Sequence, residues 1–246
     1  MIIRDFGDRS KKTVIMLHGG GLSWWNYKPL IPFIETDYHI VLPVLDGHAG
    51  SDRPFTSIED NAREIVDYID EQYAGHVFLI GGLSLGGQVL LEMISLRHDI
   101  CSFAIVESAL VIPMRITGSL IDAAVKMSYP LVSRKWFAKL QFLSLGLPDE
   151  LFEDYFRDTV RIARPDMTAF LKANAAYSVK DSLRNVKGKV LITAGGKEPF
   201  TVKRSAKLLH ETIQGSRLNI VPGYIHGELS ISHPDKYAEL MRELTG

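Results

Sequence analysis

The fold is decided by one stretch, Val77-Phe78-Leu79-Ile80-Gly81-Gly82-Leu83-Ser84-Leu85-Gly86-Gly87. Its first four residues are an apolar run typical of a buried strand, and residues 88–97 follow the glycines in a helical pattern. Gly82 and Gly86 leave room for strand and helix to approach each other on either side of Ser84. The spacing Gly82-x-Ser84-x-Gly86 therefore predicts a nucleophile elbow, a sharp turn that exposes the serine hydroxyl at the end of a sheet.

Two loops are candidates for stabilising negative charge beside that serine. The Leu85 amide begins the predicted helix, where N–H groups lack intrahelical acceptors and favour an anion. A glycine cluster, His18-Gly19-Gly20-Gly21, follows another buried strand. It is not a dinucleotide fingerprint, because Trp24 stands where glycine or alanine is needed, nor a P-loop, because no Gly-Lys-Ser/Thr follows. We expect no cofactor, and an oxyanion hole made by the Leu85 amide with that of Gly20 or, as the alternative, Gly21.

Composition limits the choice of partners. The 246 residues carry 28 Lys and Arg against 29 Asp and Glu, and this net charge of -1 gives no reason to expect nucleic acid or an acidic membrane as a partner. The N-terminus lacks the long apolar segment of a signal peptide, and no later apolar run reaches the length of a membrane span. We expect a cytoplasmic monomer or homodimer whose partner is a small-molecule substrate.

Runs of β-forming residues alternate with helical patterns along most of the chain, which indicates an α/β fold with a largely parallel sheet. The alternation stops between residues 113 and 185, where only helical patterns occur. We therefore expect a core of residues 1–112 and 186–246, and a helical cap of residues 113–185 over the carboxyl edge of the sheet. The predicted strands cover residues 2–6, 14–17, 39–43, 77–80, 101–106, 189–193 and 217–221.

The predicted topology brings distant side chains together. Parallel strands joined by helices place their carboxyl ends at one edge of the sheet, so the loops that follow them converge there. Ser84 needs a base that takes its proton and an acid that orients the base. His226, in a Gly-flanked loop after the last strand, is the predicted base. Glu198, after the penultimate strand, is the preferred acid, and Glu107, after an earlier strand, is the alternative.

With these residues in place, the sequence resembles the α/β-hydrolase superfamily over nearly its whole length. The motifs in chain order are His18-Gly19-Gly20-Gly21, Asp46-Gly47-His48-Ala49-Gly50-Ser51-Asp52-Arg53-Pro54, the elbow, Gly195-Gly196-Lys197-Glu198 and Gly223-Tyr224-Ile225-His226-Gly227. The resemblance implies an α/β-hydrolase fold, in which helices flank a mostly parallel central sheet and a helical cap is inserted after the sixth strand. Two positions depart from the superfamily pattern, since Glu198 stands where most members have Asp and Ala49 replaces a glycine.

The resemblance also implies a reaction, namely acyl transfer to Ser84 followed by hydrolysis of the acyl-enzyme, with no metal. A serine nucleophile excludes the branches that resemble haloalkane dehalogenases and epoxide hydrolases, which use Asp. We predict a carboxylesterase-like enzyme that acts on small or medium, largely apolar esters or related acyl or lactone substrates. The predicted pocket wall consists of Trp24, Trp25, Gln88, Met114, Met127, Trp136 and Phe137.

Three alternatives stay open from the sequence. A carbon–carbon bond hydrolase or lyase would need arginines to hold a dicarboxylate. An acyltransferase would pass the acyl group to an alcohol or thiol instead of water, and a non-enzymatic sensor would bind a small ligand in the same pocket. The arginines available for the first are Arg115, Arg134, Arg157, Arg161 and Arg164.

Overall fold

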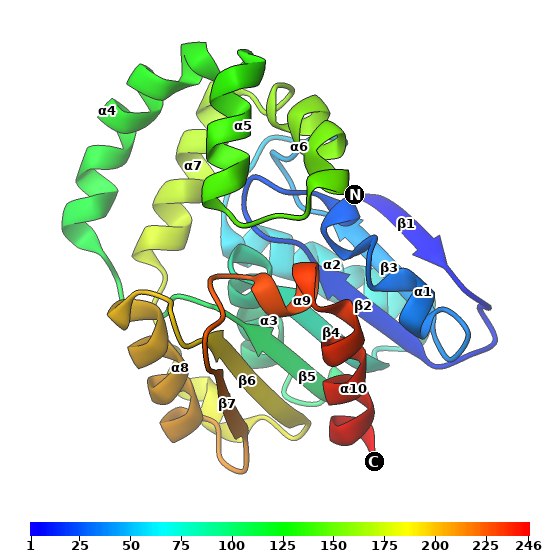
Figure 1. The fold of residues 1–246 in the computed structure, drawn as a ribbon. Helices are drawn as coiled ribbons and strands as arrows, with labels where there is room; N and C mark the ends of the chain where they lie inside the picture. The colour runs from blue at the N-terminus through cyan, green and yellow to red at the C-terminus, as the bar shows by residue number, and fades with distance from the viewer.

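The structure is a computed structural model that describes the backbone of residues 1–246 and every side chain except those of residues 115–119. The strands are β1 (Ile2–Phe6), β2 (Thr13–Leu17), β3 (His39–Val44), β4 (Val77–Leu83), β5 (Cys101–Glu107), β6 (Lys189–Gly195) and β7 (Arg217–Val221). They form one sheet in the order β1-β3-β2-β4-β5-β6-β7 (Figure 1). β1 pairs antiparallel with β3 and the other five pairs are parallel. The predicted mostly parallel sheet is therefore confirmed.

Helices cover both faces of this sheet. Along β2, Ile15 and Leu17 belong to the core on one face, and Val14 and Met16 to the core on the other, as the alternation of a strand requires. The first face packs against α2 (Ile58–Tyr73), α3 (Leu85–Leu96) and α8 (Phe200–Thr212), and the second against α1 (Ile31–Ile34) and α10 (Pro234–Thr245). Shorter elements are η1 (Trp24–Tyr27), η3 (Asp181–Asn185) and α9 (Glu228–Ser232).

A helical insertion lies between β5 and β6. It contains α4 (Arg115–Val132), α5 (Lys135–Ser144), η2 (Asp149–Leu151), α6 (Phe152–Thr159) and α7 (Arg164–Ala176). Figure 1 shows these helices gathered above the sheet. The expected position after a sixth strand was wrong, because only five of the seven strands precede the insertion. Across the described chain, no helix combines the length and apolar character needed to cross a bilayer.

Buried polar contacts attach the insertion to the rest of the chain. The Trp25 indole Nε1 donates to Asp158 Oδ2 at 2.9 Å, which ties α6 to η1. Gln88 Nε2 on α3 donates to the Asn174 carbonyl oxygen at 3.0 Å, and Asn174 Nδ2 donates back to Gln88 Oε1 at 3.0 Å. Separating such pairs would leave buried polar groups unsatisfied, so these contacts hold α6 and α7 over the sheet.

Candidate active site

Ser84 lies at the turn between β4 and α3. Its backbone has φ of 53°, a left-handed conformation that is costly for a residue with a side chain and is found mainly where the surrounding structure enforces it. Its amide donates to the Glu107 carbonyl oxygen at 2.8 Å. A Cβ on Gly82 would overlap the Gly86 carbonyl oxygen, and one on Gly86 would overlap the Leu17 carbonyl oxygen. The turn therefore requires glycine at both positions.

Glu198 and His226 form a hydrogen-bonded pair. His226 Nδ1 lies 2.7 Å from Glu198 Oε2, while Glu198 Oε1 accepts from the Gly195 amide at 2.7 Å and from Ser108 Oγ at 2.6 Å. Burial by itself would raise the pKa of Glu198, but the hydrogen bonds from His226, Ser108 and Gly195 and the charge of His226 outweigh it and lower the pKa. Glu198 is therefore an ionised carboxylate in hydrogen-bond contact with the imidazole.

Glu107, the alternative acid, has different partners. Its Oε1 accepts from the Ser230 amide at 3.2 Å, and among the described side chains its Oε2 has no hydrogen-bond partner. Only 2% of the residue is exposed, and burial raises the pKa of its carboxyl to about 7. No hydrogen bond joins it to His226 in the described part of the chain, so the geometry favours Glu198 as the partner of the imidazole.

Ser84 and His226 line the same cavity, which has a volume of about 110 Å³. Most of its other walls are apolar. They consist of Gly19, Gly20, Leu22, Leu83, Leu145, Leu147, Gly227 and Ile231. Within the described side chains, no group of three or more His, Cys, Asp or Glu residues is arranged to hold a metal ion. The cavity thus combines a hydroxyl and an imidazole with an apolar surround.

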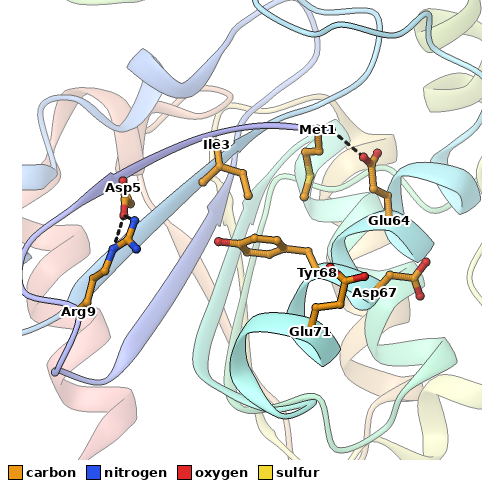
Figure 2. Close-up of a pocket in the computed structure, with 8 residues that line it drawn as sticks. All are labelled: Met1, Ile3, Asp5, Arg9, Glu64, Asp67, Tyr68 and Glu71. Atoms are coloured by element: carbon orange, nitrogen blue, oxygen red, sulfur yellow. Dashed lines mark hydrogen bonds and ion pairs between the residues drawn. The ribbon is translucent and has the colours of Figure 1, made fainter.

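A larger cavity, of about 480 Å³, lies at β1 and α2 (Figure 2). Four of its charged groups form two ion pairs, Arg9 with Asp5 and the Met1 amine with Glu64 at 3.0 Å. Neither serine nor histidine is among its described lining residues. It therefore lacks the nucleophile and base that the smaller cavity contains.

The two residues predicted to supply the oxyanion donors lie next to each other. A Cβ on Gly20 would be 3.5 Å from the Leu85 side chain, so the glycine loop touches the first residue of α3. Within the described part of the chain, neither the Gly20 nor the Leu85 amide has a hydrogen-bond acceptor. The Gly21 amide donates to His48 Nε2 at 3.0 Å. Because this bond occupies Gly21, the geometry favours Gly20 over the alternative.

Two buried histidines order the glycine loop. His48 Nδ1 lies 3.0 Å from the Asp46 carbonyl oxygen, and His18 Nε2 accepts from the Leu45 amide at 3.1 Å. Burial lowers the pKa of His48 to about 4, and burial together with the neighbouring His48 lowers that of His18 to about 3. Both rings are therefore neutral near pH 7, which allows one nitrogen of each to accept from a backbone amide.

A sequence profile of the alpha/beta hydrolase family matches residues 14–240. The chain belongs to the alpha/beta hydrolase family. A pimeloyl-[acyl-carrier protein] methyl ester esterase of Neisseria meningitidis serogroup C is 26% identical over 245 residues, which cover 94% of this chain and 93% of the relative.

Solved structures share the fold of this hydrolase. An alpha/beta hydrolase family protein from Desulfitobacterium hafniense superposes with a TM-score of 0.81 at 20% identity, covering 100% of both chains. An esterase from Exiguobacterium antarcticum gives a TM-score of 0.81 at 22% identity, covering 99% of this chain and 94% of its own. At these identities the likeness establishes the architecture.

None of the seven side chains predicted to form the pocket wall of the hydrolase is found at the cavity with Ser84. Trp25 and Gln88 are fully buried and hold the insertion through the hydrogen bonds described above. Trp24 stacks on Phe6, with ring centroids 5.9 Å apart, and lines a different cavity. These three residues serve packing between elements.

The other four predicted wall residues lie on the insertion or at its start. Met127 and Trp136 are 78% and 60% exposed. Phe137 packs edge-on against Trp136, with centroids 5.7 Å apart, and the Met114 amide donates to the Ala175 carbonyl oxygen at 2.7 Å. These positions do not support the expectation that apolar side chains of the insertion face the cavity, since Met127 and Trp136 face solvent.

Sequence reasoning also missed residues that do lie at the site. Leu145 and Leu147 follow α5 outside regular structure, where no periodic pattern marks them. Leu22 is next to the glycine loop in the sequence and Leu83 is next to Ser84. These positions were the signal from which their place at the cavity could have been predicted. Ser108 adjoins the alternative acid in the sequence, but its hydrogen bond to the preferred acid depends on the packing of two strands.

Proposed function

We propose that this protein is a serine hydrolase that cleaves small or medium, largely apolar carboxylic esters through an acyl-enzyme on Ser84. The roles are Ser84 as nucleophile, His226 as base and then acid, Glu198 as orienting carboxylate, and the Gly20 and Leu85 amides as oxyanion donors. The observation that carries the proposal is the 2.7 Å contact between Glu198 and His226, together with the single cavity that His226 shares with Ser84.

The reaction follows from these positions. Because His226 Nδ1 donates to Glu198, Nε2 is the nitrogen left to take the proton as Ser84 Oγ attacks the ester carbonyl. The Gly20 and Leu85 amides would stabilise the oxyanion, each contributing about 3 kcal/mol or more in comparable enzymes. The carbon–oxygen bond to the alcohol then breaks and His226 returns the proton to the leaving alcohol. Water, deprotonated by His226, hydrolyses the acyl-enzyme and releases the acid.

The cavity limits the substrate. Its volume of about 110 Å³ is well below the roughly 300–1,000 Å³ of most ligand pockets, so it encloses only a short acyl or alcohol group. Its apolar walls favour hydrocarbon over charged groups. The Neisseria relative is named for a methyl ester, whose alcohol is small enough for such a space, and we include methyl esters among the substrates to be tested.

We also propose that residues 113–185 act as a cap over a core of residues 1–112 and 186–246. Leu145 and Leu147, both from this segment, lie at the cavity with Ser84 and His226. Movement of the segment that carries them would open or close the cavity. A cytoplasmic location and a monomeric or homodimeric state stay predictions.

The residues that line the cavity bear on the alternative of a carbon–carbon bond hydrolase. A carbon–carbon bond hydrolase would need cations beside the serine, and neither Arg nor Lys is among the described lining residues. Of the arginines considered from the sequence, Arg157 and Arg161 line a different cavity with Trp24, and the side chain of Arg115 lies outside the described residues. We therefore place ester hydrolysis first.

The test is hydrolysis of p-nitrophenyl esters with acyl chains of two to eight carbons, together with methyl esters. We expect turnover that Ser84→Ala abolishes and that Ser95→Ala, at a serine near the end of α3, leaves unchanged. A fluorophosphonate probe should label Ser84, as peptide mapping would show. Turnover that survives Ser84→Ala would refute the proposal. Absence of turnover, with a ligand-dependent rise in melting temperature, would favour the sensor instead.

A further inference from the structure

Ser108, directly after β5, has an unusual backbone and a buried hydroxyl. Its φ is 56°, which makes it one of three non-glycine residues with positive φ in the described chain, Ser84 being another. The residue is 2% exposed, and its amide donates to the Thr193 carbonyl oxygen at 2.8 Å. Left-handed backbone at a non-glycine residue tends to persist where it serves a site, so the direction of this side chain calls for an explanation.

The side chain of Ser108 reaches the acid of the proposed triad. Its Oγ donates to Glu198 Oε1 at 2.6 Å, beside the Gly195 amide at 2.7 Å, while Oε2 of the same carboxylate meets His226. Glu has one more rotatable bond than Asp, so its carboxylate needs additional contacts to stay in one orientation. Two donors on Oε1 supply them.

We propose that Ser108 is a positioning residue, whose hydroxyl holds the Glu198 carboxylate in the orientation that meets His226. This inference rests on the proposed hydrolase function. Ser108 touches neither the nucleophile nor the base in the described contacts, and it acts through Glu198. Its left-handed backbone aims the hydroxyl at that carboxylate from the end of the neighbouring strand.

The residue before it links the same strand end to the rest of the triad. The Glu107 carbonyl oxygen accepts from the Ser84 amide at 2.8 Å. The Glu107 carboxyl accepts from the Ser230 amide at 3.2 Å, in the helix that follows His226. Two consecutive residues therefore contact the nucleophile turn, the acid and the segment carrying the base. A shift of this strand end would alter all three positions together.

The negative charge of Glu198 supports the positioning role of Ser108. Burial would raise the pKa of Glu198, and the Ser108 hydroxyl is one of the donors that lower it instead. Hydrogen bonds to charged groups are among the stronger ones in proteins. Loss of this donor would leave Oε1 with the Gly195 amide alone, and the carboxylate would gain freedom to turn away from His226.

The test compares Ser108→Ala and Ser108→Gly with Ser205→Ala. Glycine accepts the left-handed backbone, so Ser108→Gly removes the hydroxyl without straining the folded backbone. Ser205 is a matched control, fully buried and hydrogen-bonded through Oγ to the Val111 amide at 3.0 Å. We expect both Ser108 variants to lose about 10- to 100-fold in kcat with little change in KM, the size expected for a hydrogen bond to a charged group. Ser205→Ala should keep its kcat.

A double-mutant cycle shows whether Ser108 acts through Glu198. In a Glu198→Ala background, Ser108→Gly should cost less than twofold, because the group that the hydroxyl positions is gone. Circular dichroism and melting temperature would establish that each variant is folded. Wild-type kcat in folded Ser108→Gly, or equal losses with and without Glu198, would overturn the inference.

The rate of Ser84 labelling by a fluorophosphonate provides a readout that does not depend on the choice of ester. A protein that labels at Ser84 without hydrolysing esters would contradict the proposed function, while a 10- to 100-fold slower labelling of Ser108→Gly would still support the positioning role. Labelling of Ser108→Gly at the wild-type rate would overturn that role whatever esters are hydrolysed. Failure of the wild-type protein to label would overturn both.

Discussion

Replacing Glu107 with Gln should stabilise the protein above pH 7 and change its stability little at pH 5. The residue is 2% exposed, one carboxyl oxygen accepts from the Ser230 amide at 3.2 Å, and in the described structure the other has no partner. A glutamine has the same shape and keeps an oxygen for Ser230, but it cannot ionise. It therefore resembles the protonated carboxyl that burial favours.

The magnitude follows from the pKa of Glu107. Burial raises it to about 7 in the folded protein, against an ordinary value of 4.5. Between these values the unfolded chain releases its proton while the folded protein keeps it, so the free energy of unfolding falls as the pH rises. A difference of about 2.5 in pKa corresponds to about 3 kcal/mol. This penalty is fully present above pH 7, and Glu107→Gln removes it.

Urea denaturation followed by tryptophan fluorescence, at pH 5 and pH 8, measures the effect. The variant should gain up to about 3 kcal/mol over the wild type at pH 8 and less than about 1 kcal/mol at pH 5. Glu150→Gln, at an exposed position, should show no difference at either pH. An equal gain at both pH values, or a loss at pH 8, would refute the reasoning, because neither follows from a buried carboxyl with a raised pKa.

Three further substitutions test the site and its attachment. Leu147→Trp should fill part of the cavity and lower the ratio of kcat/KM for p-nitrophenyl hexanoate to kcat/KM for p-nitrophenyl acetate by about tenfold. The control Leu140→Trp, at a position 58% exposed on α5, should leave this ratio unchanged. Equal effects of the two substitutions would show that Leu147 does not line the acyl site. His48→Ala takes away the acceptor of the Gly21 amide and should lower kcat for these esters about tenfold by loosening the oxyanion loop; an unaltered kcat would count against that role. Gln88→Ala leaves buried carbonyl oxygens unpaired and should lower the free energy of unfolding, measured by urea denaturation, by about 2–4 kcal/mol. A loss below about 1 kcal/mol would contradict this role of Gln88.

The sheet and the elbow could be predicted because their signals are local. Gly82 and Gly86 flank Ser84 at a spacing that few turns require, and alternating strands and helices fix the edge at which their loops meet. Glu107 and Glu198 could not be separated in this way, because both follow strands at the same edge. Which carboxyl reaches His226 depends on strand register and side-chain direction, and in a strand a change of one residue reverses that direction.

The cavity wall could not be predicted because helical periodicity gives faces without saying which one is buried. On α5, Trp136 and Leu140 share one face and Ala138 and Phe142 share another, and both sets have helical spacing. The structure buries Ala138 and Phe142 and exposes the first pair. The choice is made by the partners of α5, among them the Phe152 ring 5.2 Å from that of Phe142, and such long-range contacts leave no local signal.

Glu107 and Glu198 are both buried at the carboxyl edge of the sheet, and they differ in their hydrogen-bond donors. These donors, more than the position of the residue, decide which carboxyl can act as the acid of a serine hydrolase. An acid that stabilises a protonated His226 has to be ionised while the histidine works near neutral pH. Glu198 has donors from Gly195, Ser108 and His226, which lower its pKa despite burial. Glu107 has the Ser230 amide, and burial raises its pKa to about 7. In the orientation that it has in the structure, much of the Glu107 carboxyl carries a proton at the pH where the imidazole needs a negative partner.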